Sequence, residues 1–129
     1  MNMETFIQHV AVECSSVQLA DTFFTKILGI PKVKSTTLSK ELCTSIFQIH
    51  RSVQMETYDN GKARFEVFIT TEPRKSSFAH IGLEVDNTAD FLARCQAQGL
   101  KPFFIQKDGK QLLFVRDFSE NLFEVLEKH

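Results

Sequence analysis

The sequence predicts an α+β fold in which two paired βαβββ modules form an open, barrel-like curved sheet around a cleft. The first observation is a repeated phrase, in which a histidine opens a run of alternating apolar residues, at 9–13 and again at 80–84. The second is the tripeptide Phe-Glu-Val, which occurs at 65–67 and at 123–125. Two copies of one long unit indicate a paired-module domain and not a solenoid array.

The first module opens with a strand and a helix. Residues 5–14 alternate in polarity at every second position, which predicts a half-buried strand. Ser15 and Ser16 can cap the helix that follows, whose apolar residues recur at helical spacing. Gly29 is a natural C-terminal stop, and Pro31 prevents the helix from continuing.

Three further strands complete the first module, at 30–38, 53–58 and 63–70. The turn at 59–62, Asp-Asn-Gly-Lys, joins the last two strands as a hairpin. Residues 39–47 fit either a strand or a capped turn of helix, because a serine cap at their start is followed by isoleucine and phenylalanine near their end.

A linker at about 71–77, rich in serine and basic residues, separates a module at 1–72 from a second at 77–129. Twenty residues separate His9 from Gly29, and nineteen separate His80 from Gly99. The first module is longer overall by an insert, which we place around 35–51. In the second module a strand is predicted at 78–85, a helix at about 88–98, and strands at 103–107, 111–116 and 122–127.

Composition limits the partners. The chain has 129 residues, 43% of them hydrophobic and thirteen of them phenylalanine, which suits one compact domain. A net charge of -1 without a basic run argues against nucleic acid. No leader-like N-terminus or membrane-length apolar run is visible, so a cytoplasmic protein without membrane association is expected. Three cysteines without CxxC spacing predict neither a disulfide framework nor a thiolate metal site.

Four ionisable residues occupy equivalent places in the two modules, a histidine on each first strand and a glutamate on each last strand. A single histidine on a strand is more often a structural residue than a ligand. The equivalence favours a metal site instead, because two imidazoles and two carboxylates are suitable ligands for a divalent transition metal. The four ligand residues would be His9, Glu66, His80 and Glu124.

The order of strand, helix and three strands, used twice, resembles the vicinal oxygen chelate superfamily. Its members include glyoxalase I, methylmalonyl-CoA epimerase, fosfomycin-resistance proteins, extradiol dioxygenases and bleomycin-resistance proteins. The resemblance rests on the two histidine phrases, on 24–29, and on 116–125, Arg-Asp-Phe-Ser-Glu-Asn-Leu-Phe-Glu-Val. Phe118 stands where the family usually has proline, and Glu120 where it usually has glycine.

By similarity to glyoxalase I, the four ligand residues would hold nickel, cobalt, manganese or zinc. The ion would bind two neighbouring oxygens of a small substrate and stabilise an enediolate, while Glu124, with Glu66 as its counterpart, would move a proton. The resemblance therefore implies a metal-dependent isomerase or lyase. Glu66 argues against a fosfomycin-type transferase and a methylmalonyl-CoA epimerase, which do not normally carry a carboxylate at that position, and extradiol dioxygenases are longer chains.

The family offers an alternative of another class, a metal-free protein of the bleomycin-resistance type that sequesters a small aromatic ligand in an apolar cleft. The resemblance also implies a homodimer, in which His9 and Glu66 of one chain would face His80 and Glu124 of the other. A site within one chain is the other possibility.

The residues expected to make the cleft apolar are Phe47, Met55, Phe65, Phe104 and Phe114.

Overall fold

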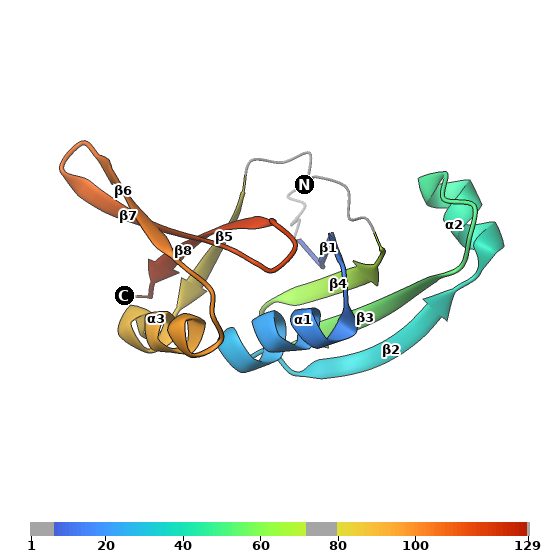
Figure 1. The fold of residues 1–129 in the computed structure, drawn as a ribbon, viewed down its shortest axis with the longest axis horizontal. Coiled ribbons are helices and arrows are strands. Elements are labelled where there is room, and N and C mark those ends of the chain that lie inside the picture. Colours follow the sequence, from blue (N-terminus) through green and yellow to red (C-terminus); the bar gives the residue numbers. More distant parts are fainter. Residues whose placement is uncertain (1–6, 72–79, 129) are drawn as a thin grey trace, which may run out of the picture.

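The computed structural model describes residues 7–71 and 80–128 and contains two four-stranded sheets flanked by helices (Figure 1). Neither sheet closes into a barrel, in agreement with the predicted open architecture. The elements are β1 (Val10–Cys14), α1 (Val17–Asp21), the π-helix η1 (Thr22–Ile27), β2 (Lys32–Leu38), α2 (Lys40–Phe47), β3 (Val53–Asp59), β4 (Arg64–Ile69), β5 (Ile81–Val85), α3 (Thr88–Ala97), β6 (Phe103–Lys107), β7 (Lys110–Arg116) and β8 (Leu122–Glu127).

Each sheet consists of one module, and the strand order is the same in both. The first sheet has the order β1-β4-β3-β2 and the second β5-β8-β7-β6. In each sheet the first strand pairs in parallel with the last, and the other pairings are antiparallel. The predicted α+β fold of two βαβββ modules is confirmed. All of the predicted linker except Thr71 lies outside the described residues.

The first helical segment begins and ends at the predicted residues. The Ser16 hydroxyl accepts a hydrogen bond from the backbone N–H of Leu19 at 3.1 Å, and so caps the helix. Gly29, with φ of 75°, follows its C-terminal end in the left-handed conformation that glycine adopts most easily. The second half of this segment is the π-helix η1, in which the neighbouring Phe23 and Phe24 are both buried.

The segment left open between strand and helix forms the helix α2. The Ser39 hydroxyl accepts a hydrogen bond from the Leu42 N–H at 3.2 Å, so capping decides the conformation there. The corresponding connection in the second module is only the turn Asp108–Gly109, between β6 and β7. The helix α2 therefore accounts for the insert placed around 35–51, and it lies at the opposite end of the molecule from α3 (Figure 1).

One aromatic core joins the two modules. Phe24 is fully buried, and its ring centroid lies 5.0 Å from those of Tyr58 and Phe65 in the first sheet. The same ring lies 6.4 Å from Phe123 in the second sheet. Each sheet thus buries its helix-facing side, and we call the opposite side its open face.

The three cysteines are buried free thiols, and burial raises the pKa of Cys95 to about 11.

A charged cluster stabilises the edge of the first sheet on its helix-facing side. Glu56 is 1% exposed, and Lys32 Nζ lies 3.0 Å from its Oε1 and 2.8 Å from Asp21 Oδ1. The Tyr58 hydroxyl donates a hydrogen bond to Asp21 Oδ1 at 2.6 Å. Desolvation alone would raise the pKa of Asp21, but the hydrogen bonds from Lys32 and Tyr58 bring it below the ordinary value of 3.8.

We expect Asp21→Asn to destabilise the protein near neutral pH and to have a smaller effect in acid. Because the folded-state pKa of Asp21 is lowered, its contribution is present above about pH 4 and is lost as the pH falls through the folded pKa. The Asp21 side chain is 40% exposed, so we expect a difference of at most about 1 kcal/mol. Urea unfolding of both proteins at about pH 7 and about pH 3 measures it. An equal difference at both pH values would contradict the prediction.

Candidate metal centre

The four predicted ligand residues lie as two pairs, one on the open face of each sheet. His9 Nε2 lies 3.4 Å from Glu66 Oε1, and His80 Nε2 lies 3.2 Å from Glu124 Oε1. The histidine side chains are both 39% exposed, and the glutamate side chains are 20% and 21% exposed. Each pair therefore presents a ring nitrogen and a carboxylate oxygen at the surface, and we call each pair a half-site.

The same strand register builds both half-sites. Glu66 is paired with Ala11 across β1 and β4, and Glu124 is paired with Gly82 across β5 and β8. Each histidine lies two residues before that partner. Side chains two residues apart on an extended chain point to the same side, so each histidine reaches the glutamate of the neighbouring strand. The sequence repeat is thereby reproduced as a repeat in geometry.

Within one chain the two half-sites stay apart. Among the described residues, no three His, Cys, Asp or Glu side chains form a group that could hold a metal ion. Each half-site offers one nitrogen and one oxygen ligand, a donor set that suits a divalent transition metal. Two such half-sites brought together would supply two of each, so the residues fit an ion when the half-sites face one another.

The two glutamates have different neighbours. Arg64 Nε lies 4.0 Å from Glu66 Oε2, while its Nη1 is bound to Asp59 Oδ2 at 2.8 Å. The residue two positions before Glu124 is Leu122, which carries no charge. Among the described residues, His80 is the only charged or titratable side chain paired with Glu124. Sequence reasoning missed Arg64, although the signal lay in the residue before each Phe-Glu-Val, arginine in one copy and leucine in the other.

Comparisons with known proteins support the architecture. No family model and no curated protein matches the sequence. Solved structures do match. A glyoxalase-family protein from Enterococcus faecalis is 21% identical, with a TM-score of 0.70 over 93% of this chain and 95% of that one. The chain has the vicinal oxygen chelate fold.

Two further solved structures with this fold extend the comparison. A glyoxalase-family protein from Bacillus cereus is 15% identical, with a TM-score of 0.77 over 98% of this chain and 95% of that chain. The fosfomycin resistance protein FosX from Listeria monocytogenes, complexed with Mn(II) and sulfate ion, is 13% identical, with a TM-score of 0.69 over 98% of this chain and 95% of that chain. These likenesses extend over nearly the whole length of all three proteins.

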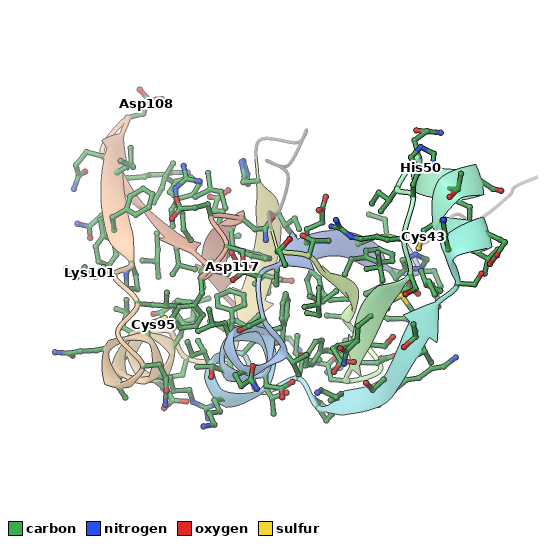
Figure 2. The ribbon with its side chains drawn as sticks, turned by 45° about the vertical axis from the view of Figure 1, so that its right-hand side comes forward. Cys43, His50, Cys95, Lys101, Asp108 and Asp117 are labelled. Carbon is green, nitrogen blue, oxygen red and sulfur yellow. The ribbon has the colours of Figure 1, made fainter. Side chains whose placement is uncertain are left out.

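The phrase at 116–125, which carried the resemblance to vicinal oxygen chelate proteins, forms the junction between the modules. Asp117 is 3% exposed and accepts hydrogen bonds from the backbone N–H groups of Ser119 and Asn121, both at 2.9 Å. The Asn121 amide donates to the backbone carbonyl of Glu13, at 3.1 Å, in the other module. Glu120 has φ of 71°, a left-handed conformation that explains the usual glycine there. Figure 2 shows Asp117 in this central position.

The residues expected to line an apolar cleft are only partly placed there. Phe65 is 3% exposed and belongs to the core, because it alternates with Glu66 and so points to the helices. Phe104 is paired with the buried Leu113, which places it on the helix-facing side of the second sheet. Met55 and Phe114 do lie on the open faces, since their strand partners are Phe68 and Glu124. The Phe47 side chain lies outside the described part of the chain.

A cavity of about 460 Å³ lies beside the second half-site. The ring of Phe114 meets that of His80 edge-on, with 5.7 Å between centroids. The cavity is lined by His80, Asp108, Lys110, Leu112, Phe114 and Glu124.

Within the described residues, no helix is both long and apolar enough to cross a membrane.

Proposed function

We propose that this protein is a divalent-metal-dependent isomerase or lyase of the glyoxalase type, acting on a small substrate that chelates through two neighbouring oxygens. The observation that carries the proposal is the repeated His–Glu half-site on the two open faces. The Mn(II) complex of FosX, a structure of the same fold, supports a divalent ion such as manganese, nickel, cobalt or zinc. The ligands would be His9, Glu66, His80 and Glu124.

The complete site would form between two copies of the chain, with the first half-site of one copy facing the second half-site of the other. The separation of the half-sites within one chain supports this arrangement. Exposed apolar side chains on the open face of the second sheet support it too, because such patches favour contact with a partner or ligand. These side chains are Phe103, Ile105 and Leu126, which are 38%, 46% and 46% exposed.

The two glutamates would divide the chemistry. A bound ion supplies Lewis-acid stabilisation of negative charge on the substrate oxygens. We assign proton transfer at the neighbouring carbon to Glu124, whose one ion-pair partner among the described residues is His80. Glu66 has the Arg64 guanidinium 4.0 Å from its second oxygen, and we assign to it mainly the role of a ligand.

Metal content tests the proposal. After reconstitution with nickel, cobalt, manganese or zinc, and removal of loosely bound ion, elemental analysis should find about one ion per chain. Glu124→Ala should weaken binding about tenfold or more, because a charged ligand is lost. Glu84→Gln is the matched control, since Glu84 lies on the same open face but on β5, two residues beyond the partner of Glu124.

Failure to retain any of these ions would overturn the metalloenzyme proposal. A metal-free binding protein for an apolar ligand is the second candidate, and the apolar side chains of Leu112 and Phe114 in the cavity favour it. Removal of metal with a chelator separates the two functions. A binding protein of that kind should keep its ligand affinity without metal, whereas the metalloenzyme should lose its turnover.

A further inference from the structure

The two half-sites share their ligands but not their surroundings. From this difference we infer that the substrate carries a flat, uncharged apolar group next to its chelating oxygens, and that this group rests on Phe114 in the cavity of the second half-site. The inference rests on the proposed function, and it adds the substrate class. It also assigns to Phe114 a role in specificity.

The open face of the first sheet is polar at the positions directly across the strands from its glutamate. Thr57 on β3 is the cross-strand partner of Glu66, and Lys34 on β2 is the partner of Thr57. Paired residues on neighbouring strands project from the same side of a sheet. Thr57 is fully buried, and its Oγ1 has no hydrogen-bond partner among the described residues. This half-site therefore has a polar residue, and not an aromatic ring, at the position across from its glutamate.

The open face of the second sheet is aromatic at the same places. Phe114 on β7 is the cross-strand partner of Glu124, and Phe103 on β6 is the partner of Phe114. The two phenyl rings are stacked, with centroids 5.8 Å apart and planes 18° from parallel. Phe103 is 38% exposed, so part of this aromatic wall remains in contact with water. A flat apolar group that covers the wall gains free energy from the surface that it buries.

The cavity has room for such a group. Its volume of about 460 Å³ falls within the range of small-molecule sites. Leu112 and Phe114 supply its apolar lining beside the half-site of His80 and Glu124. Asp108 and Lys110 add one charge of each sign from the tip of the β6–β7 hairpin, where Figure 2 shows Asp108. Apart from Glu124, which the proposed function assigns to the metal, these charges balance, so the lining offers no counter-charge to a charged group that enters.

Two hydroxamates test the inference by calorimetry on the metal-loaded protein. Benzohydroxamate and acetohydroxamate have the same pair of chelating oxygens and differ only in a phenyl or a methyl group. We expect benzohydroxamate to bind about tenfold or more tightly, because the phenyl group buries more apolar surface. Phe114→Ala should reduce this preference to about threefold or less, and Phe114→Leu, which keeps apolar bulk, should also reduce it.

Phe104→Ala is the matched control and should keep the full preference, because Phe104 lies on the helix-facing side of the same sheet. Equal affinities for the two hydroxamates in the unchanged protein would overturn the inference, and so would a full preference in Phe114→Ala. If metal is retained in either case, the proposed function still stands. Absence of metal uptake, measured separately, would overturn the proposed function and the inference together.

Discussion

A mixture of His9→Ala chains and His80→Ala chains should bind metal, although neither variant alone retains it. In a pair of copies with shared sites, one site of the mixed pair combines both intact half-sites, and the other combines both damaged ones. Mixed pairs isolated with two different affinity tags should therefore hold about half the metal of the unchanged protein. Elemental analysis of co-expressed, doubly purified pairs measures this recovery.

A mixture of His9→Ala and Glu66→Ala is the control, because both changes damage the same half-site and no combination restores it. Mixed pairs of the first kind that form but hold no metal would show that the site is not shared between copies. A chain that stays monomeric at the concentrations used would exclude the shared site directly. The experiment thus separates a site between copies from a site within one chain, independently of the substrate.

Replacing Phe24 by alanine should lower the free energy of unfolding by about 4 kcal/mol, the usual loss for a large buried aromatic side chain. The Phe24 ring lies against Tyr58 and Phe65 in one module and Phe123 in the other, so its removal weakens both sheets at once. Urea unfolding should still show a single transition, because the two modules share this core.

Phe104→Ala serves as the control for this loss. Phe104 is 48% exposed, so its truncation should cost well under half as much, about 1 kcal/mol. Two separate transitions in the Phe24→Ala protein, or a loss as small as that of the control, would show that the modules fold independently of this contact.

The repeat in the sequence made the fold predictable, whereas the pairing of neighbouring strands sets where each strand begins and ends. Alternation predicted a first strand at 5–14, of which 5 and 6 lie outside the described residues. The strand β1 begins at Val10, where its pairing with Phe65 of β4 begins. The conformation of 39–47 could not be decided from the sequence, since a serine cap and β-prone residues give opposite indications there. In the structure the Ser39 cap prevails.

The site was predictable only in part, because distance along the chain does not determine which strands lie side by side. Equivalent positions in the repeat indicated which glutamate belongs with each histidine. In the structure the histidine Nε2 and glutamate Oε1 of each pair lie no more than 3.4 Å apart. The separation of the two half-sites depends on how the shared core packs the modules, which no local pattern encodes. Phe114 is the neighbour of Glu124 through strand register, and register is fixed by the whole sheet.

The π-helix η1 explains why the two modules differ by one residue between histidine and glycine. Each histidine lies seven residues before a helix cap, Ser16 or Asn87, so the extra residue falls inside the first helix. A π-helical turn holds more residues than an α-helical turn, and it takes up that residue before Gly29. Chain length can therefore change within this helix while the two histidines keep equivalent positions before their helix caps. Equivalent residues of the two halves must be matched through space and not by counting along the chain.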